Sequence, residues 1–147
     1  MSEPAEQAER PEQPGPALAL TAPAEPDVVE QVQERLADLW ESEGVDPGTA
    51  MRFEMGLVEI LGNIVEHAYA PDAPGRMLTV EVEVRDGVVR GTLGDNGQPI
   101  AIDLSSVTMP DEDAESGRGL ALALAALDEL AYERDGGRNR WHLRCGT

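Results

Sequence analysis

The sequence predicts an α+β fold of two layers, in which helices pack on one face of a mostly antiparallel, mixed β-sheet. Amphipathic stretches with helical spacing occupy the first half of the chain, and alternating apolar stretches dominate the second half. Two glycine turns, Asp86-Gly87 and Asp135-Gly136-Gly137, separate pairs of alternating stretches and indicate antiparallel hairpins. Because a half-apolar sheet and amphipathic helices must cover each other, these elements predict two packed layers.

The size and charge of the chain narrow its function. Its 147 residues suit one domain, and its formal net charge of −18 comes from 29 acidic and 11 basic side chains. Such a surface repels phosphate backbones, so we expect no direct nucleic-acid ligand. The single cysteine, Cys145, excludes a disulfide within the chain and fits a reducing cytoplasm. No signal peptide or membrane-spanning run is evident, so we expect a cytoplasmic protein with no membrane partner.

We expect a tail followed by one domain. Residues 1–15 are rich in Pro, Glu, Gln and Ala, which predicts a disordered, acidic tail. The predicted domain covers residues 16–147. Its first element is a short strand at Leu18–Thr21, because this stretch alternates between apolar and small or polar residues. The prolines on either side of the strand favour a position at the edge of the sheet.

Two helices are expected after this strand. Asp27 is the predicted N-cap of the first helix, which ends near Gly44, a typical C-terminal residue. Asp46 and Pro47 begin the second helix as its N-cap and first helical residue, and the helix extends to about Tyr69. The apolar positions of the two helices are Val28, Val32, Leu36 and Leu39 in the first, and Leu57, Ile60, Leu61, Ile64 and Ala68 in the second.

The second half of the chain predicts two hairpins and a third helix. Met77–Val84 alternates as a strand with one solvated face, and Val88–Asp95 returns beside it. Residues 96–116 have little regular pattern, and a loop of this length inside a domain is typical of a lid. A helix and a second hairpin complete the chain, at residues 119–130, 131–134 and 140–144.

A polar stripe on the second predicted helix is the first candidate site. Glu59, Asn63 and His67 are spaced four residues apart, so their side chains share one face. A carboxylate accepts a proton from an attacking hydroxyl, and an amide oxygen is a ligand that Mg²⁺ accepts beside phosphate. The alternative is a solvated helix face, with His67 capping or packing at the helix end. Gly62 weakens the helix by about 1 kcal/mol relative to Ala, which argues for a ligand or packing contact beside Asn63.

Asp95 and Gly97 form the second candidate site. A carboxylate at the end of an apolar strand suits a hydrogen bond from the exocyclic amine of adenine, and Gly97 lets the backbone approach the ring. The alternative is an ordinary Asx turn, the commonest use of an Asp-Asn-Gly sequence.

The third candidate site is the sequence Ser-Gly-Arg-Gly-Leu at residues 116–120, which begins the third predicted helix. Backbone N–H groups at a helix N-terminus point at anions, and glycine permits a tight phosphate cradle to which Arg118 adds charge. The alternative is a flexible loop, because Gly-x-Gly alone is a weak signal. A Walker A loop is excluded, since its Gly-Lys-Ser/Thr element is missing.

The order of the three motifs resembles the GHKL ATPase superfamily, whose nucleotide-binding architecture is the Bergerat fold. Within that superfamily the chain looks like the stand-alone bacterial anti-sigma factor serine/threonine kinases. The matching residues are Glu59 and Asn63 of the N box, followed by His67 and Tyr69; Asp95, Gly97 and Pro99 of the G1 box; and Gly117, Gly119 and Leu120 of the G2 box.

The resemblance implies a role for each matched residue. Glu59 would be the general base, Asn63 the Mg²⁺ ligand and Asp95 the reader of adenine. The phosphate loop would be Gly117 to Gly119. The remaining predicted nucleotide contacts are His67, Gly97, Arg118 and Leu120.

The activity that the resemblance implies is an ATP- and Mg²⁺-dependent serine/threonine protein kinase. Such a protein phosphorylates a small STAS-type anti-sigma factor antagonist and, in another partner state, sequesters an RNA polymerase sigma factor; related proteins suggest a homodimer. One alternative is a binding module that holds ATP as a structural ligand and sequesters a partner without chemistry. Another is a kinase or switch in a pathway unrelated to sigma factors. The intact Glu59 favours an enzyme over a pure binding module.

Overall fold

The computed structural model describes residues 17–67, 74–99 and 115–146. The predicted tail and most of the predicted lid lie outside these ranges, so both stay predictions. In chain order the described elements are β1 (Leu18–Pro23), α2 (Asp27–Glu43), α3 (Pro47–His67), β2 (Met77–Arg85), β3 (Val88–Asp95), α4 (Glu115–Ala126), β4 (Glu129–Asp135) and β5 (Arg138–Cys145).

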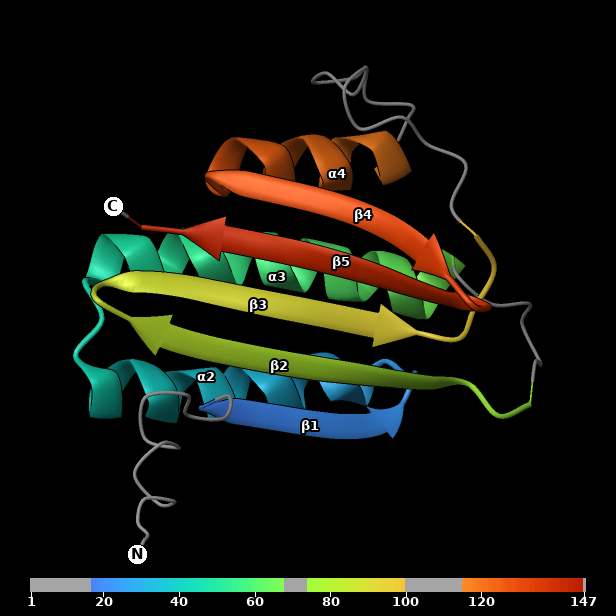
Figure 1. Cartoon of the computed structure of the whole chain (residues 1–147), viewed down its shortest axis with the longest axis horizontal. Coiled ribbons are helices and arrows are strands. Elements are labelled where there is room, and N and C mark those ends of the chain that lie inside the picture. The colour runs from blue at the N-terminus through green and yellow to red at the C-terminus, as the bar shows by residue number, and fades with distance from the viewer. Residues whose placement is uncertain (1–16, 68–73, 100–114, 147) are drawn as a thin grey trace, which may run out of the picture.

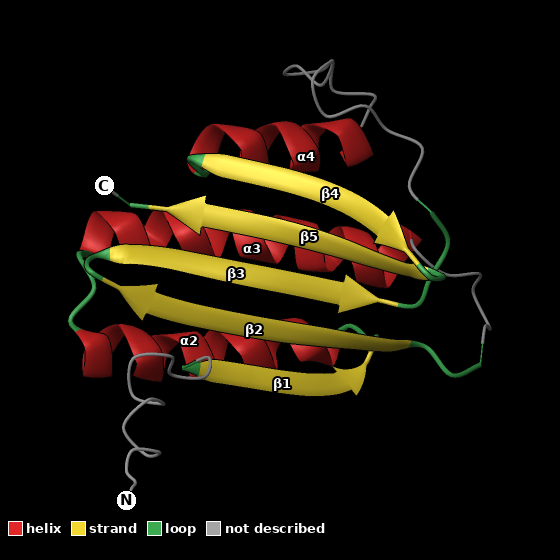
Figure 2. Cartoon of the chain, in the orientation of Figure 1, coloured by secondary structure: helices red, strands yellow, loops and turns green. Residues whose placement is uncertain are grey.

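The strands form one sheet in the order β1-β2-β3-β5-β4. A helical layer covers one face of it, with α2 behind β1 and β2 and α3 behind β3 and β5 (Figures 1 and 2). The predicted two-layer α+β architecture is therefore confirmed. The sheet is antiparallel rather than mixed, since every strand pair among the described residues runs antiparallel.

The start of α2 differs from the prediction. Pro26 occupies the N-cap position and no side chain caps the helix, so the prediction of Asp27 as the N-cap is wrong. Proline sets a φ of −55° that already suits the helix, and Asp27 becomes a first-turn residue whose charge the helix dipole favours. The predicted end is confirmed, because Gly44 adopts a left-handed φ of 62° and donates its N–H to the Trp40 carbonyl.

Helix α3 begins as predicted. The Thr49 N–H donates to Asp46 Oδ2 at 3.0 Å, which satisfies one of the free amides of the first turn. The described helix reaches His67, and the predicted end near Tyr69 lies outside the described residues. The apolar face is buried as expected, with Leu57, Ile60, Leu61 and Ile64 each at most 2% exposed.

Both predicted hairpins are present. Asp86 and Gly87 both have positive φ, at 55° and 79°, as a tight turn matched to the twist of the strands requires. Gly136 and Gly137, with φ of 60° and 79°, make the equivalent turn between β4 and β5. The second hairpin is longer than predicted, because β4 already begins at Glu129.

Helix α4 lies four residues earlier than the predicted 119–130, at Glu115–Ala126. The Asp128 N–H donates to the Arg144 carbonyl at 2.9 Å, and Leu130 pairs with Leu143 in the sheet. An apolar run of this kind suits a buried helix or a buried strand equally well, so pairing with β5 decides where the helix ends. The Ser-Gly-Arg-Gly motif at residues 116–119 consequently lies inside the first turns of α4 rather than in a loop before it.

The core lies between the sheet and the helices and depends on glycine at close contacts. A Cβ at Gly91 of β3 would lie 2.7 Å from Phe53 Cζ, so this glycine leaves room for the fully buried ring. A Cβ at Gly56 of α3 would lie 2.6 Å from Leu127 Cγ, so glycine here lets α3 approach the end of α4. Among the described residues, no helix combines the length and hydropathy that crossing a membrane requires.

Candidate functional site

The three sequence motifs lie at the same end of the molecule. Asp95 ends β3, the polar stripe occupies the C-terminal half of α3, and the glycines of the third motif begin α4. These three ends lie on the same side of the fold (Figure 1), because β3 and α3 run toward it and α4 starts there. Topology therefore gathers residues that are far apart in sequence.

Glu59 and Asn63 face the beginning of α4. Both side chains are partly buried, and a Cβ built on Gly119 would lie 2.9 Å from Glu59 Oε1 and 3.8 Å from Asn63 Nδ2. Any side chain at position 119 would thus displace the carboxylate. The structure brings the first and third motifs into contact, and glycine at 119 is what permits it.

Of the other residues of these two motifs, one lies in the core and the rest are helical residues at the beginning of α4 or the end of α3. Leu120 is 1% exposed and belongs to the core, where it anchors α4. Gly117 and Arg118 are helical residues of α4, and His67 is the last described residue of α3. The side chains of Arg118 and His67 lie outside the described part of the structure, so their predicted contacts stay predictions.

Gly62 lies in open space. A Cβ at this position would meet no atom of the described residues within 4 Å, apart from its own helix and neighbours. A packing contact within the described part is therefore not the reason for this glycine. The alternative, room for a ligand beside Asn63, stays a prediction.

Asp95 is fully buried at the end of β3. Its Oδ1 accepts hydrogen bonds from the Gly97 N–H and from Asn139 Nδ2, both at 2.8 Å. The first of these bonds is the Asx turn expected as the alternative use of this sequence. A turn alone does not account for the carboxylate, however, because Oδ2 is buried and accepts no hydrogen bond from the described residues.

The unpaired Oδ2 atom is energetically unfavourable and chemically informative. Burial raises the pKa of Asp95, although the hydrogen bonds from Asn139 and Gly97 oppose this shift. Leaving a buried polar acceptor unpaired costs on the order of 1–3 kcal/mol. Such an atom suits a ligand that brings an N–H or O–H donor, as the exocyclic amine of adenine does. The residues present therefore fit an adenine nucleotide.

The hairpin of β4 and β5 orients this carboxylate through Asn139, a buried residue that sequence reasoning missed. The Asn139 amide donates to Asp95 Oδ1 at 2.8 Å and to the Gln98 carbonyl at 2.7 Å. Its own oxygen accepts from Arg134 at 3.0 Å and from the Tyr132 hydroxyl. The Asn139 oxygen is thus occupied as an acceptor, and its NH₂ group is the part that faces Asp95. The NH₂ group bonds to Oδ1 of Asp95, and Oδ2 remains an acceptor without a partner among the described residues.

Arg134 extends this support to the turn after β3. One of its guanidinium nitrogens, which also contacts Asn139, donates to the Gly97 carbonyl at 2.8 Å. The signal that points to these residues is register, since Asn139 lies directly opposite Asp95 on the neighbouring strand. Register across β3 and β5 depends on strand order, which the sequence pattern did not reveal.

Comparison with known proteins agrees with this geometry. A family model described as the histidine kinase-like ATPase domain matches residues 22–144. No curated protein is similar enough in sequence to match the chain.

Several solved structures share the fold at low sequence identity. The RsbU and RsbW domains of Rv1364c from Mycobacterium tuberculosis match 90% of this chain at 23% identity and a TM-score of 0.59, and this chain spans 34% of that longer one. A chain of the SiaB–SiaC complex from Pseudomonas aeruginosa matches at 17% identity and a TM-score of 0.63. The match covers 99% of this chain and 99% of the matched chain. The histidine kinase domain of the blue-light activated kinase EL346 from Erythrobacter litoralis covers 80% of this chain at 19% identity, with 60% of its own chain matched and a TM-score of 0.53.

The family match extends over most of the chain, and the solved structures independently agree on the fold. The three motifs on which the resemblance to the GHKL superfamily rests lie together at one end of that fold. The chain belongs to the family of histidine kinase-like ATPase domains.

Proposed function

We propose that this protein binds ATP with Mg²⁺ and transfers the γ-phosphoryl group to a serine or threonine of a small STAS-type partner protein. In its other partner state it holds an RNA polymerase sigma factor inactive. The observation that carries the proposal is the Glu59 carboxylate, which faces the start of α4 across a gap that only glycine at 119 leaves open. A carboxylate in this position suits a general base, a group that phosphoryl transfer uses and that ATP binding alone does not require.

Each residue of the site has a distinct proposed role. Asp95 Oδ2 accepts a hydrogen bond from the exocyclic amine of adenine, and Gly97 allows the backbone to approach the adenine ring closely. The backbone N–H groups at the start of α4 donate hydrogen bonds to phosphate oxygens, because a helix N-terminus favours negative charge. Asn63 offers its amide oxygen to Mg²⁺, which commonly shares its coordination between protein oxygens and phosphates.

Glu59 accepts the proton of the attacking hydroxyl. Bound ATP would supply the phosphoryl group and leave as ADP, and Mg²⁺ would neutralise part of the charge on the phosphates. The contribution of the chain is then mainly positioning and electrostatic stabilisation, as in other phosphoryl transfers. The partner proteins are proposed from the resemblance and from the solved neighbours, one of which contains RsbU and RsbW domains and another of which is a complex of SiaB with SiaC.

The proposal is tested with γ-labelled ATP. Wild-type protein and Glu59→Gln are first shown to bind ATP equally and are then incubated with lysate of the source organism. We expect label on a small protein with wild type only, and phosphoamino acid analysis should recover phosphoserine or phosphothreonine. Tight ATP binding without labelling by either protein would overturn the kinase and leave a nucleotide-dependent binding module. Equal labelling by both proteins would remove the general-base role from Glu59.

A further inference from the structure

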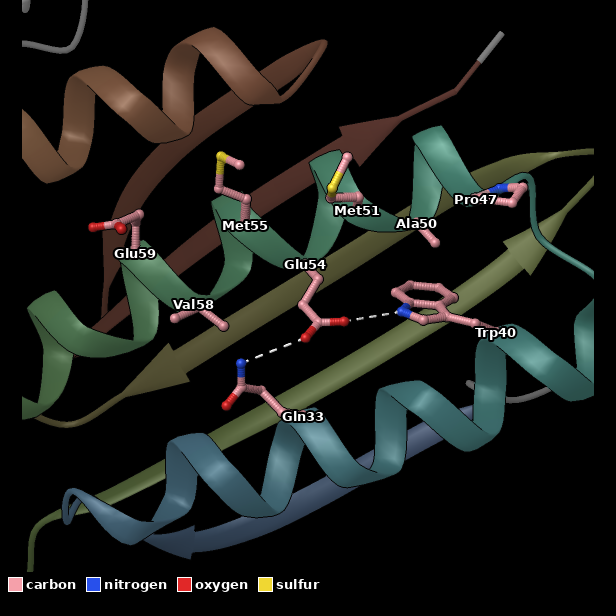
Figure 3. Close-up of a pocket in the computed structure, with 9 residues that line it drawn as sticks. All are labelled: Gln33, Trp40, Pro47, Ala50, Met51, Glu54, Met55, Val58 and Glu59. Atoms are coloured by element: carbon pink, nitrogen blue, oxygen red, sulfur yellow. Dashed lines mark hydrogen bonds between the residues drawn. The ribbon is translucent and has the colours of Figure 1, made fainter.

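Two exposed methionines continue the stripe that carries Glu59. Met51 and Met55 are 63% and 45% exposed, and they are among the few large apolar side chains exposed in the described residues. They precede Glu59 by eight and four residues on α3, so all three share one helix face. Figure 3 shows the three side chains in a row along the same side of α3. Exposed apolar side chains close to a candidate catalytic residue are typical of a surface that binds a partner.

The row borders a shallow groove between α2 and α3. The groove has a volume of about 470 Å³, and its lining includes Met51, Met55 and Val58 of α3, Trp40 of α2, and Glu59 at one end. Helix α2 supplies the opposite wall (Figure 3). The groove therefore leads along α3 directly to the carboxylate that the proposed function uses.

Hydrogen bonds hold the walls of this groove together. Glu54 accepts a bond from Trp40 Nε1 at 3.1 Å and one from Gln33 Nε2 at 3.4 Å, so one side chain of α3 ties down two of α2. These contacts engage polar atoms of Glu54, Trp40 and Gln33 and leave the methionine side chains as the adaptable part of the surface. Methionine is flexible and polarizable, and it is frequent at surfaces that bind other proteins.

The negative charge of the groove indicates what kind of partner segment it can bind. Its charged lining residues are Glu54 and Glu59, both acidic. The two arginines of α2 and α3 in the described residues reach other parts of the fold, since Arg35 donates to the Ala19 carbonyl and Arg52 to the Ala126 carbonyl. A partner segment with apolar and basic side chains complements such a surface. A second copy that presented the same face would place acidic side chains against acidic side chains, so this groove does not complement itself.

We propose that Met51 and Met55 dock the phosphoacceptor protein, through an apolar side chain close in sequence to its phosphorylated serine or threonine and a basic side chain near it. This inference rests on the proposed function and deepens it. Four and eight residues of helix correspond to about 6 and 12 Å along α3. An extended segment advances about 3.3 Å per residue, so the apolar residue lies about two to four positions from the hydroxyl residue.

The test separates docking from catalysis with isosteric polar substitutions. The double variant Met51→Gln/Met55→Gln is compared with wild type and with Met77→Gln, a matched control on β2 whose methionine is 37% exposed. The probes are the STAS-type antagonist proteins of the source organism, each purified and assayed singly with γ-labelled ATP. Thermal unfolding of each variant is measured first, and we expect all of them to fold because the substituted side chains are exposed.

We expect the double variant to raise the KM for the phosphoacceptor by about tenfold, the effect of losing apolar contacts at an interface. Its ATP affinity and kcat should stay within about twofold of wild type, and Met77→Gln should change none of the three. An unchanged KM in the double variant, with wild type active, would overturn the docking inference and leave the kinase intact. Absence of transfer by wild type to any of the probes would overturn both.

Discussion

The buried carboxylate of Asp95 shows how one residue can be unfavourable for folding and useful for binding. Burial raises its pKa, so the folded state holds the proton more tightly than the unfolded chain. For an acid shifted upward, the resulting stabilisation is present at low pH and is lost as the pH rises from the ordinary pKa through the raised one. Ionising Asp95 therefore costs folding free energy, and a ligand that donates a hydrogen bond to Oδ2 can offset that cost.

Asp95→Asn should separate the two effects. The substituted amide keeps an oxygen for Gly97 and Asn139 but turns a donor toward the ligand, where adenine also offers a donor. We expect ATP affinity to fall by about 10- to 100-fold, the usual worth of a charge-assisted hydrogen bond, with little change in the affinity for tripolyphosphate. Calorimetric titrations with both ligands measure this, and an equal loss for both would contradict the adenine role.

The same variant gives a pH test. Without ligand, the unfolding free energy of Asp95→Asn relative to wild type should grow as the pH rises above about 4, the ordinary pKa of an aspartic acid, because only wild type must ionise a buried acid. Urea unfolding at several pH values measures it. A difference that stays constant across this range would show that Asp95 titrates as it does in the unfolded chain.

Asn139 extends the argument to a residue that does not touch the proposed ligand. Asn139→Leu removes the two donors that hold Asp95 and the Gln98 carbonyl. We expect a loss of about 1–3 kcal/mol in unfolding free energy and a weaker affinity for ATP, since the carboxylate loses its fixed orientation. Gln98→Ala is the matched control, because the exposed Gln98 contributes only its backbone carbonyl to this contact. Equal ATP affinity in both variants would mean that Asn139 does not position Asp95.

At the scale of elements, the close packing of α4 against α3 positions the candidate site. Gly56 lets the end of α4 pack against α3 through Leu127, and Gly119 lets its beginning lie against Glu59. Both glycines forgo about 1 kcal/mol of helix propensity relative to Ala. One of them serves packing and the other keeps the candidate base in position.

Gly119→Ala tests the second role. The new Cβ would lie 2.9 Å from Glu59 Oε1, so the flexible Glu59 side chain must move. We expect phosphoryl transfer to fall by about tenfold or more, because small misplacements of catalytic groups have large effects. The unfolding free energy should change by no more than about 1 kcal/mol, since Ala favours the helix while the contact opposes it. Single-turnover transfer and urea unfolding are the measurements, and full transfer activity would show that Glu59 need not lie where it does.

At the scale of the whole molecule, the charge is the dominant feature. The excess of 29 acidic over 11 basic side chains creates repulsion that is strongest in the folded state. Raising the ionic strength from about 0.01 M to about 0.15 M shortens the screening length from about 30 Å to about 8 Å. We expect the melting temperature to rise over this range in sodium chloride. A fall would mean that attractive surface pairs, such as Arg144 with Glu129, outweigh the net repulsion.

Most of the fold could be predicted because its signals are local. The Asp86-Gly87 turn, the Gly44 C-cap and the Asp46 N-cap each depend on a few neighbouring residues, and all three occur in the structure. The errors arose where local signals were ambiguous. At the start of α2 both Pro26 and Asp27 are suitable first residues, and Pro26 takes the N-cap position. The apolar run after Leu120 suits a helix and a strand equally well, so its pattern does not show where α4 ends.

The sequence by itself determined the order of elements, the apolar faces and the candidate residues Glu59, Asn63, Asp95 and Gly119. Their periodicity and spacing depend only on backbone geometry within a single helix or turn. Only the tertiary structure decided that Gly119 contacts Glu59, that Asn139 holds Asp95, and that Asp95 Oδ2 is left unpaired. These facts depend on which strand lies beside which, and strand order is set by packing the whole core rather than by any short stretch of residues.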